Sequence, residues 1–386
     1  MKSKKIIALL MSVLLVLSFM AGCGDSSQPA PAQTPAQENQ EEASPEAPAG
    51  ETRKITDMLG REVEVPATVN TIVALGNTPR LITYLGLADK VVGYSGMDPE
   101  KATPACAYAY ANKERWANVP IVGTDAGGQT DYYPEEIIKT APDIILASCP
   151  LELAQDLEKQ IGIPVFVVKP DRIMTREYDQ CLLLLGEVCG VEEKAQEVVD
   201  YIHACLDDLA NRTKDIPEDE KPDVLSAAAT FKGAHGLEGV RIKDAVMEAA
   251  GAKNLAAELD GQSLCVITDM EQILAWNPEY IFLDSGGVGL VRQDAKEHPD
   301  FYEKLRAFNE GKVYQYPSST SYYENLEIPL ANSYFVGSVL YPEQFKDINV
   351  RDKANEIMKY FLGVDDYMSI LEETGQGYCA VELGKD

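Results

Sequence analysis

Two stretches of this sequence match each other and decide the fold class: EEIIKTAPDIIL at residues 135–146 and EQILAWNPEYIF at residues 271–282. The offset is a constant 136 residues, and the proline, the acid after it and two isoleucines coincide. Each stretch has the pattern of a short helix, a proline that cannot continue it, and a buried strand. The repetition predicts two related lobes. A chance resemblance between two generic helix-strand units is the alternative.

Short apolar runs alternate with helical stretches around both units, which is typical of parallel sheets with crossover helices. Helical patterns are at Pro79–Leu87 and Pro134–Thr140. Buried strands are predicted at Thr71–Leu75, Lys90–Tyr94, Asp143–Ala147, Pro164–Val168, Asp223–Ala229, Tyr280–Asp284 and Lys312–Tyr316. The sequence therefore predicts an α/β protein made of two doubly wound lobes.

Residues 176–215 are predicted to link the lobes. From Arg176 to Lys214 there is no proline and apolar residues recur at near-helical spacing, although Gly190 leaves a break open. A continuous helix here would be about 55 Å long. We expect an N-terminal lobe at 53–175, this linking helix, and a C-terminal lobe at 216–386. One long helix between two lobes restricts their relative motion and leaves a ligand cleft between them.

The first 22 residues have the form of an export signal: a basic start, an apolar run too short for a comfortable membrane span, and small residues before Cys23. The stretch from Ser18 to Cys23 resembles the lipobox of bacterial lipoproteins, in which the cysteine is acylated. Residues 23–52 are rich in proline, glutamine and acids, and are predicted to be a disordered tether. We expect an exported protein held by lipid on the outer face of the cell membrane. The alternative is an uncleaved anchor helix.

The charge excludes some partners. The chain has 34 Lys and Arg against 62 Asp and Glu, a net charge of -28. Setting aside residues 1–52 leaves 31 bases and 56 acids, so the net charge of -25 belongs to the two lobes. Nucleic acid and anionic lipid surfaces need clustered cations, and neither is expected to bind. Self-repulsion favours a soluble monomer.

Catalytic and metal-binding patterns are missing from the sequence. It has three histidines, no GxSxG elbow, no Walker A motif, and no CxxC or HxxxH spacing. Seven cysteines remain once Cys23 carries lipid, and we expect them to be free and mostly buried. We expect no enzyme, cofactor or protein-bound metal. An extracytoplasmic α/β oxidoreductase is the alternative from another class.

Ligands of open α/β sheets bind beyond the carboxyl ends of the strands, which in two facing lobes line one cleft. Among the residues there, Arg80 and Lys232 stand out because cations are scarce, and one from each lobe could hold an anionic ligand. His235 could hydrogen-bond the ligand or a chelated metal, and the tyrosine pair 322–323 leaves direct ferric ligation open. The expected ligand-binding residues are Asn77, Thr78, Arg80, Tyr94, Ser95, Thr124, Ser148, Phe231, Lys232, His235, Ser285, Ser318, Tyr322 and Tyr323.

The opening RKITDMLGREVEVP at 53–66, with Thr71-Ile72-Val73 after it, resembles periplasmic binding proteins that serve iron-siderophore, heme and cobalamin importers. The likeness continues through LGLADKVVG at 85–93 and YPEQFKDI at 341–348. It implies two α/β lobes joined by one long helix, and a receptor that delivers a metal chelate to an ABC permease and its ATPase. An Fe(III)-siderophore is the expected ligand, with a corrinoid or heme as the alternative. Arg80 stands near where much of the family has a docking glutamate, so docking carboxylates cannot be assigned.

Overall fold

The computed structural model describes residues 51–96, 101–126, 129–321 and 323–383. The expected signal segment, Cys23 and nearly all of the expected tether lie outside these residues. Within the described part of the chain, no helix combines the length and the apolar character that crossing a membrane requires.

The N-terminal lobe, from β1 to β8, is built on a sheet with strand order β6-β5-β4-β3-β7-β8. Strands β3, β4, β5, β7 and β8 run parallel, and β6 is antiparallel to β5. A separate antiparallel hairpin, β1-β2, precedes it. The elements are β1 (Thr52–Thr56), β2 (Glu62–Pro66), β3 (Ile72–Leu75), α1 (Thr78–Tyr84), β4 (Val91–Ser95), α2 (Ala107–Ala111), β5 (Ile121–Ala126), β6 (Gln129–Tyr132), α3 (Pro134–Thr140), β7 (Ile144–Ala147), α4 (Leu151–Ile161) and β8 (Val165–Val167).

The C-terminal lobe, from β9 to β17, has a sheet with strand order β11-β9-β13-β14-β17, in which only β17 is antiparallel to its neighbour. Its strands are β9 (Asp223–Ala227), β10 (Gly239–Arg241), β11 (Lys253–Asn254), β12 (Cys265–Ile267), β13 (Tyr280–Asp284), β14 (Val313–Tyr316), β15 (Thr320–Ser321), β16 (Tyr323–Glu324) and β17 (Cys379–Ala380). Its helices are α7 (Ala245–Ala249), α8 (Met270–Trp276), α9 (Val288–Glu297), α10 (Pro299–Tyr302), α11 (Arg306–Asn309), α12 (Glu327–Leu340), α13 (Val350–Leu362) and α14 (Tyr367–Glu373).

The matching stretches occupy equivalent places in the two lobes. Helix α3 leads to β7, and α8 leads to β13. Each helix ends on a left-handed residue, Ala141 with φ 44° and Asn277 with φ 41°, directly before the proline. Strand β7 pairs in parallel with β3, which is the first strand of its sheet along the chain. Strand β13 pairs in parallel with β9, which is the first strand of the other sheet. The predicted α/β fold with two related lobes is confirmed.

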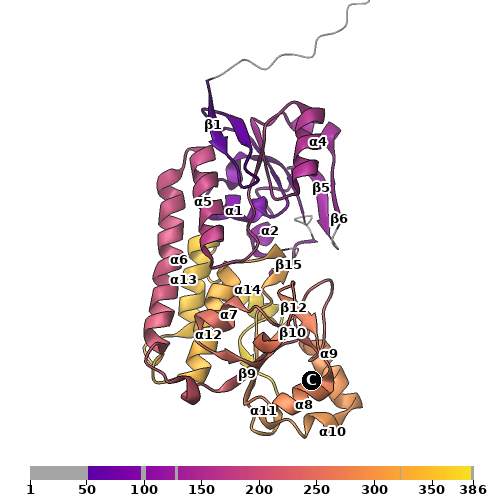
Figure 1. Cartoon of the computed structure of the whole chain (residues 1–386), viewed down its shortest axis with the longest axis vertical. Coiled ribbons are helices and arrows are strands. Elements are labelled where there is room, and N and C mark those ends of the chain that lie inside the picture. Colours follow the sequence, from indigo (N-terminus) through magenta and orange to yellow (C-terminus); the bar gives the residue numbers. More distant parts are fainter. Residues whose placement is uncertain (1–50, 97–100, 127–128, 322, 384–386) are drawn as a thin grey trace, which may run out of the picture. The chain divides into compact units, whose positions relative to one another are not determined.

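The linking segment contains two helices, α5 (Arg176–Cys189) and α6 (Glu192–Thr213), which lie side by side (Figure 1). Gly190 ends α5 with φ 69°, so the continuous 55 Å helix does not form. The chain turns back after Gly190, and α5 and α6 pack closely at Gly186, where an added Cβ would lie 2.4 Å from the Cβ of Ala195. Helix α6, about 33 Å long, is the part that leads into the C-terminal lobe.

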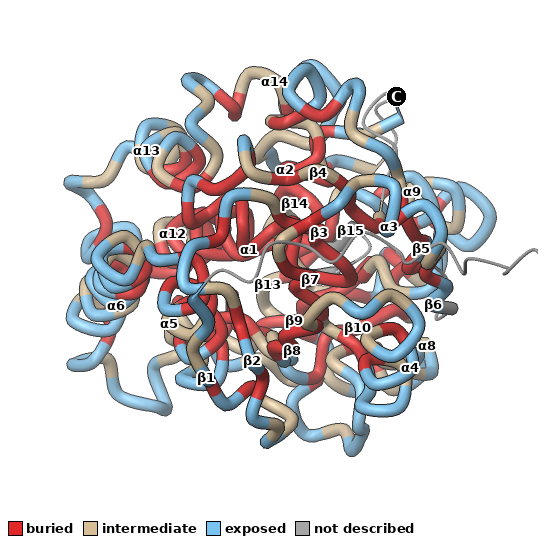
Figure 2. The backbone as a smooth tube through the Cα atoms, turned by 90° about the horizontal axis from the view of Figure 1, so that it is seen from above, coloured by how far each residue is buried: buried red, intermediate tan, exposed pale blue. Residues whose placement is uncertain are grey.

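The apolar core is continuous between the lobes. One cluster joins residues of α1, such as Leu81, with residues of α12 and α13, such as Leu330 and Phe361. Strands β3 and β7 are buried throughout and β9 and β13 in all but their first residue, while the outer helices expose one face to solvent (Figure 2). The lobes therefore rest on each other as well as on the linking helices.

No disulfide joins the cysteines of the described residues, as expected. Cys106, Cys149, Cys181, Cys189, Cys205 and Cys265 are buried, and Cys379 is exposed. Burial raises the pKa of the Cys181 and Cys189 thiols to about 12. These side chains behave as small apolar groups.

Candidate functional site

Both sheets have a topological switch point, where successive connections leave in opposite directions. In the N-terminal lobe it lies between β3 and β7, because β4 pairs with the other edge of β3. In the C-terminal lobe it lies between β9 and β13, because β11 pairs with the other edge of β9. Ligands of open α/β sheets bind outside the carboxyl ends of strands at such points. A ligand is therefore expected to bind among the loops after β3, β7, β9 and β13.

At the N-terminal switch point, a close backbone approach joins the loops after β3 and β7. Gly76 has φ 68°, and a Cβ there would stand 2.3 Å from the Oγ of Ser148. The backbone N–H of Asn77 donates to this Oγ at 2.6 Å. A residue with a side chain at position 76 would separate the two loops, so glycine is required by both space and backbone conformation.

Two hollows adjoin at this point and share Asn77, Pro170 and Asp171. We call their union the interlobe groove. The hollow over the N-terminal lobe measures about 520 Å³ and includes Ser148. The other measures about 260 Å³ and extends over the C-terminal lobe. Its lining residues are Asn77, Pro170, Asp171, Ile173, Thr230, Phe231, Lys232, Arg241, Ser263, Leu264, Cys265 and Glu324.

The loop after β9 forms one wall of the groove. Phe231 packs against the ring of His235, with ring centroids 4.2 Å apart, and His235 Nε2 lies 2.9 Å from the backbone oxygen of Phe231. Lys232 has φ 49° and its side chain is exposed at the rim. Gly287 lies directly against this loop, because a Cβ at this position would stand 2.2 Å from the backbone oxygen of His235. His235 thus shapes the wall.

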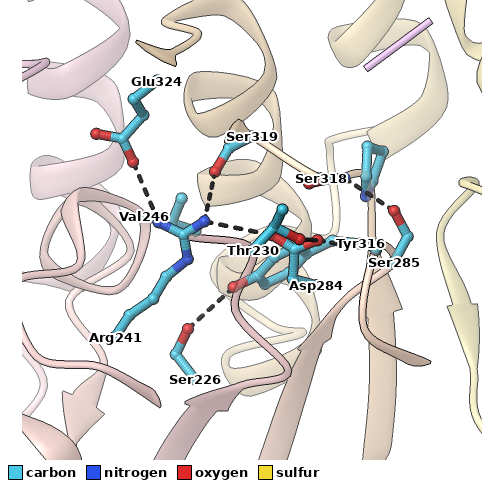
Figure 3. A network of polar contacts seen from close by, with 12 residues as sticks. Ser226, Thr230, Arg241, Val246, Asp284, Ser285, Tyr316, Ser318, Ser319 and Glu324 are labelled. Atoms are coloured by element: carbon cyan, nitrogen blue, oxygen red, sulfur yellow. Dashed lines mark hydrogen bonds and ion pairs between the residues drawn. The ribbon is translucent and has the colours of Figure 1, made fainter. Parts of the chain in front are cut away.

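A buried arginine, Arg241, lines the part of the groove over the C-terminal lobe and is the centre of a polar network (Figure 3). Arg241 Nη2 donates to Asp284 Oδ2 at 3.3 Å and to Ser319 Oγ at 3.0 Å, and Nη1 donates to Glu324 Oε1 at 3.3 Å. Asp284, the last residue of β13, also accepts from the Thr230 hydroxyl at 3.3 Å. These contacts join β10, β13 and β16 around one guanidinium.

The two carboxylates of this network differ in position. The Asp284 side chain is 0% exposed, whereas that of Glu324 is 15% exposed and lines the groove. Burial raises the pKa of Glu324, and Arg241 acts in the opposite direction. Burial also raises the pKa of the neighbouring Cys265 thiol to about 11, so this group is uncharged at neutral pH.

Arg80 lies behind the groove, 1% exposed, where the two lobes meet. Its Nε donates to Asn325 Oδ1 of the C-terminal lobe at 2.9 Å, and its Nη1 donates to Asn77 Oδ1. The guanidinium also lies 4.6 Å from the ring centroid of Tyr108. Burial opposes its charge, but Tyr84, Tyr108, Cys106 and Glu327 offset this effect and raise its pKa. Arg80 is therefore placed as an interlobe contact.

The structure brings only some of the expected ligand-binding residues to the groove. Asn77, Ser148, Phe231 and Lys232 line it. Thr78, Tyr94 and Ser95 are buried beneath the loops, and Thr124 is exposed on β5. Ser318 donates its backbone N–H to the Ser285 hydroxyl at 2.9 Å, which joins the loops after β13 and β14. Tyr322 lies outside the described residues, and nothing is described of the Tyr323 side chain.

The groove is also lined by Arg241, Glu324 and Asp171, which are not among the residues expected from the sequence. One feature of the sequence pointed to such a cation. The predicted buried strand Tyr280–Asp284 ends in an aspartate, and a buried carboxylate needs a cation as its partner. Which of the scarce cations meets Asp284 depends on the fold. Within the described ranges, no group of three or more His, Cys, Asp or Glu side chains is placed to hold a metal ion.

The two-lobe fold with its interlobe groove can be compared with known proteins. Residues 72–320 match the family model described as periplasmic binding protein, which covers more than half of the chain. The chain belongs to the periplasmic binding protein family. The predicted family resemblance is confirmed.

Relatives agree with this family assignment. The chain is 26% identical over 308 residues, 78% of its length and 87% of the relative's, to YvrC of Bacillus subtilis, described as an uncharacterized ABC transporter substrate-binding lipoprotein. The fold resembles that of MolA of Haemophilus influenzae bound to molybdate, with TM-score 0.63, 20% identity, and 81% and 98% of the two chains covered. It also resembles CeuE of Helicobacter pylori with Ni(II) bound, with TM-score 0.60, 18% identity, and 83% and 99% covered.

Proposed function

We propose that this periplasmic binding protein is the substrate-binding component of an ABC importer, and that it captures a metal chelate of the Fe(III)-siderophore type in the interlobe groove. It hands the chelate to a membrane permease driven by an ATPase. It acts as a binding protein without catalysis, as a monomer held to the outer face of the membrane by lipid on Cys23.

The groove is the observation that carries this proposal. A hollow of about 520 Å³ continues into one of about 260 Å³. Small-molecule sites have volumes of about 300–1,000 Å³, far more than a bare metal ion occupies. The walls offer an aromatic ring from Phe231, hydroxyls from Ser148 and Thr230, and charged groups. This mixture suits a chelate with an apolar body and polar edges.

The comparisons support the same class of ligand. The MolA structure carries molybdate and the CeuE structure carries nickel, so related folds hold metal species. YvrC is described as a substrate-binding lipoprotein of an ABC transporter, which supports the proposed partners and the lipid at Cys23. The continuous core between the lobes supports a largely preformed groove, which lowers the cost of ordering on binding.

The test is a fluorescence titration of the full chain in detergent with ferric tris-hydroxamate, ferric tris-catecholate, cobinamide, heme and free Fe(III). We expect a ferric chelate to bind with a dissociation constant below about 10 μM, close to -7 kcal/mol. Tighter binding of cobinamide or heme than of either ferric chelate would show that the protein is a corrinoid or heme receptor instead. No binding of any of these compounds would overturn it.

A matched pair of variants locates the site. Phe231→Ala removes a ring from the groove wall and should weaken the affinity for the best-binding compound by about tenfold. Leu290→Ala removes an exposed apolar side chain from α9, outside the groove residues, and should leave the affinity unchanged. Equal effects of both substitutions would place the ligand elsewhere.

A further inference from the structure

The charges that line the C-terminal end of the interlobe groove sum to zero. Lys232 and Arg241 are the cations there, and Asp171 and Glu324 are the anions, among the described lining residues. The groove therefore differs from the sequence-based expectation of two cations, Arg80 and Lys232, holding an anionic ligand. Arg80 is turned to Asn77 and Asn325 behind the groove.

The positive charge of Arg241 is already balanced by one carboxylate, that of Asp284, without Glu324. Its Nη2 donates to the fully buried carboxylate of Asp284 and to the Ser319 hydroxyl (Figure 3). Neither Asp284 nor Ser319 is among the lining residues of the groove. Glu324 adds a second carboxylate on Nη1. One guanidinium thus faces two carboxylates, and the partly exposed one, Glu324, is the excess negative charge that a ligand meets.

The other cations of the groove, Lys232 and Lys169, are poorly placed to offset this charge. Both side chains are exposed, where water and salt weaken their attraction for a ligand. Glu324 is mostly buried, where like charges repel more strongly than in water. Asp171 on the opposite wall adds to the repulsion of an incoming polyanion.

We propose that Glu324 is a specificity-determining residue, and that it makes the groove select metal complexes of zero or positive net charge over polyanionic ones. This inference rests on the proposed function and narrows its ligand class. Like charges brought together at a binding site cost enough to lower affinity by at least about tenfold. The groove should therefore prefer a neutral ferric tris-hydroxamate to a trianionic ferric tris-catecholate of similar size.

The experiment measures both dissociation constants for the full chain in detergent, for wild type and for Glu324→Gln. Wild type should bind the neutral complex at least about tenfold more tightly than the trianionic one. Glu324→Gln should strengthen binding of the trianionic complex by about tenfold and leave the neutral complex within about twofold. Glu343→Gln, on an exposed side chain that contacts only Lys346 at 3.6 Å among the ion pairs described, is the control for net charge and should change neither value.

Melting curves show whether each variant is folded. Should Glu324→Gln not fold, Asp171→Asn tests the same repulsion from the opposite wall, with a smaller gain expected for the trianionic complex. Wild-type affinity for the trianionic complex that equals or exceeds that for the neutral complex overturns the inference and leaves the proposed function standing. An equal gain in Glu343→Gln also overturns it. Absence of binding by every metal complex tested overturns the proposed function, and the inference with it.

Discussion

At the residue scale, Arg212 and Asp347 show how a surface charge pair stabilises the link between α6 and the loop after α12. Arg212 Nη1 donates to Asp347 Oδ1 at 2.7 Å and Nη2 donates to Oδ2 at 3.0 Å. The Arg212 hydrogen bond lowers the pKa of Asp347 to about 2. Paired hydrogen bonds of this kind are stronger than single contacts between exposed charges.

This pair predicts an acid-dependent loss of stability. The folded-state pKa of Asp347 is depressed, so its contribution is present above its unfolded pKa of about 4 and is lost as the pH falls through about 2. Asp347→Asn should lower the urea midpoint at about pH 7, and the difference from wild type should shrink as the pH falls from about 4 toward 2. Urea unfolding followed by circular dichroism across this range measures it. A difference independent of pH would mean that the substitution acts through packing.

At the element scale, glycines set how closely neighbouring segments approach. Gly186 lets α5 pack against the start of α6, and its position explains why the linking segment folds into two helices. The break at Gly190 supplies the left-handed residue that ends α5. Helical periodicity alone could not decide between one helix and two, because both arrangements bury the same apolar residues.

Gly186→Ala should therefore destabilise the protein although alanine favours helices. The added Cβ meets Ala195 at 2.4 Å, and overpacking of this kind costs about 1–3 kcal/mol. Gly289→Ala is the matched control, because Gly289 lies in α9 with nothing within 4 Å of an added Cβ. The control should be neutral or stabilise by up to about 1 kcal/mol. Free energies of unfolding from urea titrations compare the two, and equal values would show that α5 and α6 separate at little cost.

Across the whole molecule, contacts between the lobes lead us to expect that they unfold as one unit. Asn325 accepts from Arg80 and donates its amide to the backbone oxygen of Ala105 at 2.7 Å, so it ties the C-terminal lobe to two parts of the N-terminal lobe. The buried Glu327 accepts from the Tyr84 hydroxyl next to it. Together with the continuous apolar core, these contacts couple the stability of the lobes.

The two tryptophans can report on this coupling, because Trp116 lies in the N-terminal lobe and Trp276 in the C-terminal lobe. In Trp116→Phe and Trp276→Phe variants, urea unfolding curves from the remaining tryptophan should each show one transition. Asn325→Ala, added to either variant, should lower its stability by about 1–3 kcal/mol, because it removes an acceptor of a buried guanidinium. A loss reported by one tryptophan alone would mean that the lobes unfold independently.

Patterns in the sequence were enough to predict the two-lobe α/β fold, its family, and several element bounds, including α3 at Pro134–Thr140 and β13 at Tyr280–Asp284. These follow from local rules, since proline, left-handed caps and apolar periodicity act over a few residues. The folded structure was needed to show that Arg241 and Glu324 line the groove while Arg80 joins the lobes. Arg80 meets Asn325 across 245 positions, and Arg241 meets Glu324 across 83. The partner of a buried charge at such separations is set by where the sheets bring their loops together, which no local pattern encodes.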